Sequence, residues 1–146
     1  MRFEHDNDDP VLKLTEEQCW ELLAHSAHGR VATAAAGIID IVPVNFAVHK
    51  GYIFIRTAPG NKLAAMTVNS SIAFEADGVL SDEAWSVVVH GTAAVLESEE
   101  EIREARESGV TPWSPTLKDA WVRVKVERIS GRHFILGAQP EVTDEA

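Results

Sequence analysis

Alternation of apolar and polar residues predicts short β-strands along most of the chain. Residues 52–57 read Tyr-Ile-Phe-Ile-Arg-Thr, which places Ile53 and Ile55 on one face of a strand and Phe54 and Arg56 on the other. The same pattern, or a short run of β-branched residues between turn signals, predicts further strands at 29–35, 38–49, 72–77, 85–96, 120–126 and 133–136, the last two separated by a turn at 129–132.

Glycine and proline indicate how these strands connect. Gly37 and Gly51 predict tight turns, so the first three strands form an antiparallel meander. Pro43 has no N–H to donate, so a bulge or a sheet edge is expected in the second strand. Gly91 predicts a bulge or bend in the long strand 85–96.

Helix signals lie in three of the connections. Thr15 and Gln18 form the pattern of a capping box, and Ser98 is a typical N-cap for a helix that ends at Gly109. Asn61 is the expected N-cap of a short helix after the strand 52–57. Six or seven antiparallel strands with helices in the connections predict a mainly β fold. The pattern fits a closed or nearly closed barrel, and a β-sandwich is the alternative.

Composition limits the possible functions. A chain of 146 residues fits one domain, predicted at 14–137, between flexible acidic ends at 1–13 and 138–146. The net charge of -10 argues against a general nucleic-acid binder and against attraction to anionic membranes. No long apolar run is present, so a cytoplasmic location is expected.

Metal and thiol chemistry find little support in the sequence. Cys19 is the single cysteine, which excludes an intramolecular disulfide and a cysteine metal cluster. Its helical setting predicts a buried, inert thiol. His25 and His28 have a spacing that suits a metal, but no third ligand accompanies them, so no metal site is predicted.

One arrangement of charges suggests an anion. Arg56 ends a strand, and six residues later Lys62 lies in the first turn of the predicted helix. A helix N-terminus favours negative charge, so a lysine there is expected to accompany a bound anion. Phosphate fits best, because arginine grips it with two parallel hydrogen bonds. Taken alone, the two cations also fit ordinary surface charges.

Several short pieces, in this order and spacing, resemble a known family. They are Gly29-Arg30-Val31-Ala32, Asp40 to Asn45, Arg56 to Leu63, Phe74-Glu75-Ala76-Asp77, Trp85 to Val89, Pro112-Trp113 and Trp121 to Val124. The chain is similar to the FMN-binding split-barrel family related to pyridoxamine 5′-phosphate oxidase, in particular to its short bacterial flavin-nucleotide-binding members. The resemblance implies a six-stranded antiparallel split β-barrel with helices in the connections, and a homodimer with two flavin sites at its interface.

The resemblance also implies which residues contact the cofactor. They fall into four groups: Arg56, Thr57, Lys62 and Leu63 around the FMN phosphate; Pro43, Val44, Asn45, Phe54 and Ile55 along the isoalloxazine; Trp85, Ser86 and Val87 at the polar edge of the ring; and Trp113 and Trp121 from the partner subunit. Arg30 would stabilise negative charge on the reduced flavin if it points into the cleft. Packing in a core or an interface is the alternative role of the tryptophans.

The resemblance leaves the reaction open. The oxidase has a Trp-Gln pair followed by a substrate motif with arginine and histidine, and here only Arg132-His133 remains, so pyridoxamine phosphate oxidation is not expected. A flavin-dependent oxidoreductase acting on an unknown small molecule and a non-catalytic flavin carrier or sensor both fit. Relatives of this fold also bind a deazaflavin, or haem, for which His49 and His90 are the candidate ligands.

Overall fold

A computed structural model describes residues 3–6, 9–111 and 120–138. The fold is mainly β. Its elements are β1 (Val11–Lys13), α1 (Glu16–Ala24), β2 (His28–Ala35), β3 (Ile38–His49), β4 (Tyr52–Thr57), α2 (Asn61–Val68), β5 (Ser71–Val79), β6 (Glu83–Val95), α3 (Glu99–Glu107) and β7 (Ala120–Ile135). Among these helices none has both the length and the apolar character needed to span a bilayer.

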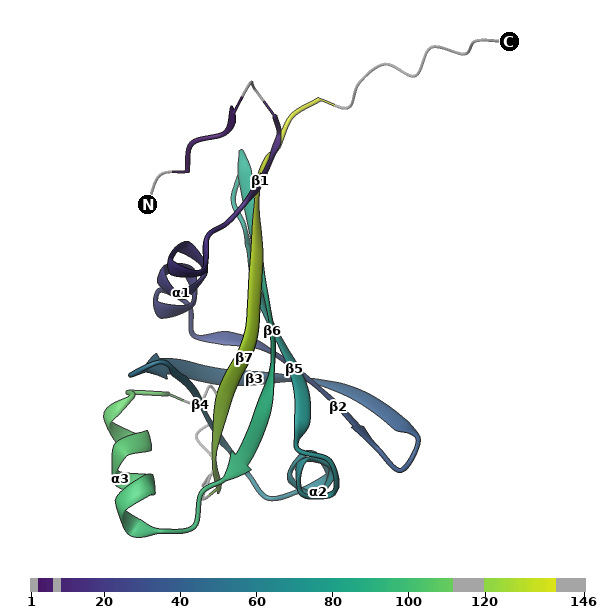
Figure 1. The fold of residues 1–146 in the computed structure, drawn as a ribbon, viewed down its shortest axis with the longest axis vertical. Helices are drawn as coiled ribbons and strands as arrows, with labels where there is room; N and C mark the ends of the chain where they lie inside the picture. The colour runs from purple at the N-terminus through teal and green to yellow at the C-terminus, as the bar shows by residue number, and fades with distance from the viewer. Residues whose placement is uncertain (1–2, 7–8, 112–119, 139–146) are drawn as a thin grey trace.

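All seven strands belong to one antiparallel sheet. The strand order is β1-β7-β4-β3-β2-β5-β6, and β7 also pairs with β6, so the sheet closes on itself (Figure 1). The structure thus has seven strands where the resemblance implies six. The additional strand is β1, which pairs with β7 through the register Val11↔Phe134 to Lys13↔Arg132. Part of the N-terminal segment predicted to be flexible is therefore a strand of the sheet.

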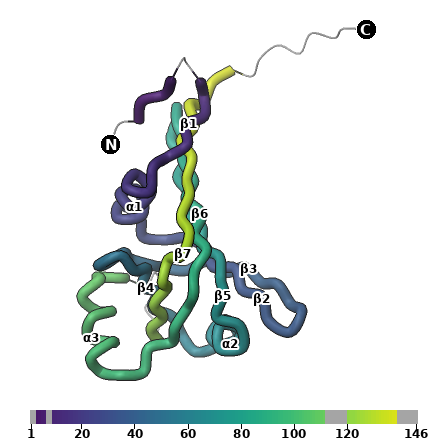
Figure 2. Tube along the Cα trace, in the orientation of Figure 1, coloured from purple at the N-terminus to yellow at the C-terminus, as the bar shows by residue number. Residues whose placement is uncertain are grey.

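The prediction of two strands separated by a turn at 129–132 was wrong. β7 is one continuous strand of 16 residues that follows β6 through most of its length (Figure 2). Gly131 lies beneath α1, where a Cβ atom would be 2.8 Å from Cys19 Sγ and 3.0 Å from the Ser86 carbonyl oxygen. The glycine thus permits close packing of the helix on the sheet and does not mark a turn.

Two disturbances of the strands were predicted correctly. The register of β6 against β7 shifts between His90 and Gly91, which is the expected bulge. Pro43 lies in the part of β3 that pairs with β2 alone, because pairing with β4 begins only at Phe46. The proline therefore occupies a free edge, and the ladder between β2 and β3 runs past it without a bulge.

The helix caps were predicted with one error. Thr15 and Gln18 form the capping box of α1, and the Ser98 hydroxyl accepts a hydrogen bond from the Glu101 N–H at the start of α3. In α2, however, Gly60 with extended backbone is the N-cap and Asn61 is the first helical residue. The chain turns into this helix one residue earlier than predicted, and no side chain caps its N–H groups.

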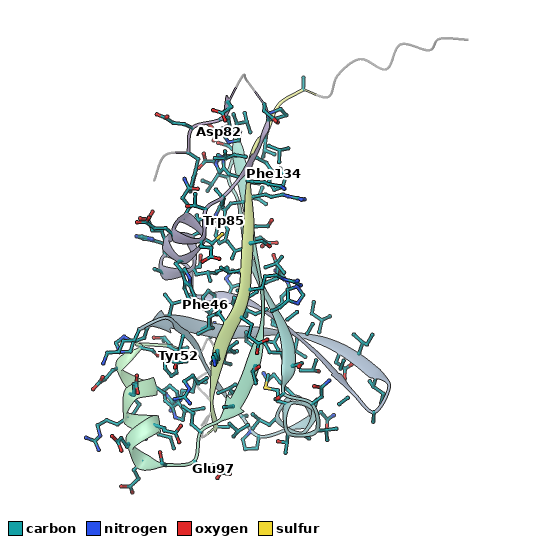
Figure 3. All side chains as sticks on the ribbon, viewed as in Figure 1. Phe46, Tyr52, Asp82, Trp85, Glu97 and Phe134 are labelled. Carbon is teal, nitrogen blue, oxygen red and sulfur yellow. The ribbon has the colours of Figure 1, made fainter. Side chains whose placement is uncertain are left out.

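Two buried clusters fix the strands that carry the candidate site. The larger fills the closed sheet and includes Phe46 and Phe74, whose rings meet edge to face at 4.8 Å. The smaller lies where β4 and β7 meet α3 and includes Phe54, Ala105 and Trp121. Figure 3 shows Phe46 and Tyr52 near the crossing of these strands. Arg56 thus belongs to a strand that is packed on both faces.

Candidate functional site

The candidate phosphate site begins where β3 and β4 separate. The two strands pair from His49↔Tyr52 to Phe46↔Ile55 and no further. Beyond that point Asn45 pairs with β2, whereas Arg56 pairs with Trp121 of β7. Asn45 and Arg56 are therefore the first residues on the two sides of the divergence. The structure brings together a predicted ring contact and a predicted phosphate contact.

Arg56 is held by an aromatic ring. Its guanidinium carbon lies 5.1 Å from the centroid of the Trp121 ring, within the range of a cation–π contact. Trp121 is only 5% exposed, because it packs in the smaller cluster. A fixed indole orients the planar guanidinium through the face of its ring. Arg56 therefore suits a two-pronged contact with a phosphate.

The start of α2 adds a second cation to this region. A short exposed stretch, 58–60, joins Thr57 to the helix, and Lys62 and Leu63 are half-buried in its first turn. The first turn of α2 carries no acidic side chain. Free N–H groups and a lysine at a helix start favour a bound anion. Thr57 is buried and its hydroxyl donates to the Ala58 carbonyl oxygen at 3.4 Å.

Arg30 is engaged by carboxylates of its own chain. Its guanidinium lies 2.7 Å from Glu75 Oε2 and 3.5 Å from Asp77 Oδ1. Burial raises the pKa of Glu75, as does the neighbouring Asp77, while Arg30 opposes that rise. In this arrangement Arg30 balances two carboxylates. Any contact with a reduced flavin would have to replace one of them.

The residues predicted at the polar edge of the flavin ring lie far from Arg56. Ser86 pairs with Arg132 of β7, whereas Arg56 pairs with Trp121, eleven residues away on the same strand. At the usual rise of a strand this is roughly 35 Å. Figure 3 places Trp85 correspondingly far along the sheet from Tyr52 of β4. A single chain does not bring Ser86 and Arg56 to one flavin.

The remaining predicted residues divide between core and surface. Val44, Phe54, Ile55 and Val87 are buried, so their side chains pack inside the protein. Pro43 is exposed at the sheet edge, and Asn45 Nδ2 donates to the Ala27 carbonyl oxygen at 3.5 Å. Trp113 lies outside the described residues.

The histidines considered as metal or haem ligands in the sequence analysis do not lie together. His90 is exposed on β6, whereas His49 Nε2 lies 3.9 Å from Glu107 Oε2. His25 Nδ1 donates to the Glu21 carbonyl oxygen at 2.7 Å. Across 3–6, 9–111 and 120–138, no group of three or more His, Cys, Asp or Glu residues is placed to hold a metal ion.

Sequence reasoning missed an apolar surface beside the candidate site. Ile39 and Ile41 are 81% and 66% exposed on the part of β3 that projects with β2 (Figure 1). The cross-strand register aligns them with Ala34 and Ala32 of β2, and Ala32 in turn with Ala73 of β5. The run Ile38-Ile39-Asp40-Ile41 breaks the alternation expected for a half-buried strand, and that break was the available signal.

The chain is similar in sequence and in structure to several known proteins. Residues 15–133 match the family model of pyridoxamine 5′-phosphate oxidase. A candidate pyridoxamine 5′-phosphate oxidase from Corynebacterium glutamicum is 42% identical, with a TM-score of 0.80 over 90% of this chain and 98% of that one. The FAD binding protein from Mycobacterium smegmatis is 35% identical, with a TM-score of 0.73 over 85% of this chain and 98% of that one. Rv3129 from Mycobacterium tuberculosis is 42% identical over 61% of this chain and 81% of its own length.

Proposed function

The chain belongs to the pyridoxamine 5′-phosphate oxidase family, and we propose that it binds FMN with the phosphate between Arg56 and Lys62. The observation that carries the proposal is the placement of Arg56 on the Trp121 ring, beside a helix start that bears Lys62 and no acidic residue. The 35% identity to a FAD binding protein supports a flavin as the ligand. Both flavin nucleotides carry phosphate, the group that these two cations recognise.

The proposed activity is that of an oxidoreductase on a small molecule. A bound flavin supplies the hydride and electron chemistry, so the protein needs to bind it, orient it and keep a substrate beside its ring. Asn45 and Pro43 lie next along β3 from the divergence at Arg56 and would border the ring. The end of the chain lacks the full substrate motif of the oxidase, so pyridoxamine phosphate is not the proposed substrate.

The proposed assembly is a homodimer of six-stranded split barrels, to which β1 adds a seventh strand. One flavin cannot reach Arg56 and Ser86 of the same chain, so Ser86 would come from the partner. The exposed Ile39 and Ile41 supply apolar surface for such contacts. A surface of this kind beside charged residues is typical of an interface between subunits.

Purified protein is expected to be yellow, or to become so after incubation with FMN. Absorbance spectra and fluorescence titrations with FMN, FAD, a deazaflavin and haem test this proposal, and FMN is expected to bind most tightly. Reduction of the complex by NADH or NADPH, followed by a screen of electron acceptors, then separates an oxidoreductase from a carrier. A colourless protein that takes up no flavin would contradict the proposal.

Aspartate at positions 39 and 41 is expected to produce monomers. In the Ile39→Asp, Ile41→Asp variant, charges replace apolar contacts at the proposed interface, and burying unpaired charges costs several kcal/mol. Light scattering measures the mass, and Leu80→Asp is the control because Leu80 is exposed in the turn between β5 and β6, outside β2 and β3. A wild-type monomer that retains full flavin affinity would contradict the shared site.

A further inference from the structure

The N-terminal segment 3–6 folds back onto β7 and covers a buried histidine. The rings of Phe3 and His133 lie 4.6 Å apart at 34°, and the His5 ring meets His133 edge to face at 5.0 Å. Phe3 also packs against the larger buried cluster. His133 is only 4% exposed, whereas the adjacent Arg132 is exposed on the opposite face of the strand. The segment thus holds to the sheet through two rings.

A chain of hydrogen bonds runs through the two histidines. His5 Nδ1 lies 2.7 Å from the Asp9 carbonyl oxygen, and His5 Nε2 lies 2.7 Å from His133 Nδ1. His133 Nε2 then lies 3.3 Å from Glu83 Oε2 of β6. The Asp9 N–H donates to the Asp6 carbonyl oxygen at 2.8 Å, which closes the turn that presents Asp9 to His5. Each ring nitrogen of the pair therefore faces a polar partner.

These partners determine how many protons the two rings carry. A carbonyl oxygen and a carboxylate only accept hydrogen bonds, so His5 Nδ1 and His133 Nε2 must both be N–H groups. The contact between the rings needs one N–H and one bare nitrogen. Two neutral imidazoles carry one proton each, which is one too few for all three contacts. The complete chain of hydrogen bonds therefore requires one neutral ring and one imidazolium.

The surroundings suit one positive charge and not two. Glu83 is the carboxylate that contacts the pair, and Leu12 and Trp85 lie opposite His133 on the neighbouring strands. The other charged or titratable side chains of the described elements around the pair are exposed or have other contacts: Glu4, Asp6, Asp9, Lys13, Cys19 and Arg132. A second proton would remove the acceptor nitrogen between the rings and place two cations 2.7 Å apart.

We infer that segment 3–6 is a pH-sensitive strap, which docks on β7 while the two histidines carry one positive charge and is released when they gain a second. Histidine changes its charge between about pH 5 and 8, so release is expected as the pH falls through this range. At higher pH, loss of the single charge leaves one contact without its proton, and docking weakens again. Docking therefore passes through a maximum. All these contacts lie within one chain, so the inference requires no bound flavin.

The test is an NMR titration of the full chain from pH 5 to pH 8.5, without added flavin. Nitrogen-15 spectra of the imidazoles distinguish N–H from bare nitrogens, and heteronuclear NOE values report the order of residues 3–6. At the docking maximum, three of the four ring nitrogens of His5 and His133 are expected to carry protons. At pH 5 the docking equilibrium is expected to be about tenfold or more weaker, because a charge-assisted hydrogen bond is lost.

The matched variants are His5→Gln and His25→Gln. His5→Gln removes the charged ring from the end of the chain, where folding of the sheet does not depend on it, so the strap should be less ordered and insensitive to pH. His25 is exposed at the end of α1, and its variant should respond as the wild type does. The inference is overturned by a docked strap with only two ring N–H groups, by equal order at pH 5 and pH 7, or by an unchanged pH response in His5→Gln.

Discussion

Alanine at positions 56 and 62 is expected to weaken FMN binding by about 10²- to 10⁴-fold, since each charge-assisted hydrogen bond contributes roughly 1.5–3 kcal/mol. The reason is geometric. Arg56 is fixed over Trp121 at the end of β4, and Lys62 lies in the first turn of α2. Flavin fluorescence titration of the Arg56→Ala, Lys62→Ala variant measures the loss. Arg103→Ala with Arg106→Ala, which removes the same charge from exposed positions of α3, is the matched control.

Riboflavin makes this test specific to the phosphate, because it has the same ring system and no phosphate. The wild type should prefer FMN to riboflavin, and the double variant should lose most of that preference while its riboflavin affinity changes little. Loss of the contact with Trp121 is expected to lower stability by about 0.5–1 kcal/mol, which thermal unfolding would detect. Unchanged FMN affinity would refute the assignment of Arg56 and Lys62.

The strand and the helix that carry Arg56 and Lys62 were predictable from the sequence because their signals are local. Alternation over 52–57 predicts the strand that ends at Arg56, and the turn residues after it predict a helix that carries Lys62 in its first turn. Only the cap was displaced, since a glycine with extended backbone takes the N-cap position that Asn61 was expected to fill. Spacing along the chain is enough when both residues flank one connection.

The rest of the site depends on pairing between distant segments. Nothing near Ser86 in the sequence shows that it lies opposite Arg132, or that Lys13 pairs with Arg132 on its other side. The three residues of β1 are too few for a periodic pattern. In the sequence Gly131 resembles a turn residue. In the structure its missing side chain lets α1 pack closely on the sheet. The distance between Ser86 and Arg56, and hence the case for a second subunit, follows only from the register of β7.

That register depends on Gly91, so Gly91→Ala is expected to cost about 2–3 kcal/mol, as overpacking of a tight core does. A Cβ atom at Gly91 would lie 2.3 Å from the Lys125 carbonyl oxygen and 3.1 Å from Val124 Cγ1. The first contact is with backbone, so relief requires β6 and β7 to move apart at the point where their register shifts. For a chain of 146 residues the midpoint of thermal unfolding should fall by about 10 °C.

Gly60→Ala is the control for Gly91→Ala. An added Cβ there meets nothing within 4 Å, and the extended backbone at Gly60 suits any residue. Its stability should change by less than about 1 kcal/mol, because alanine restricts the unfolded chain more than glycine does but is a poorer N-cap for α2. A Gly91→Ala variant as stable as Gly60→Ala would mean that β6 and β7 tolerate a wider separation at the bulge. The close approach at Gly91 would then not be what sets the pairing of β6 with β7, on which the position of Ser86 opposite Arg132 depends.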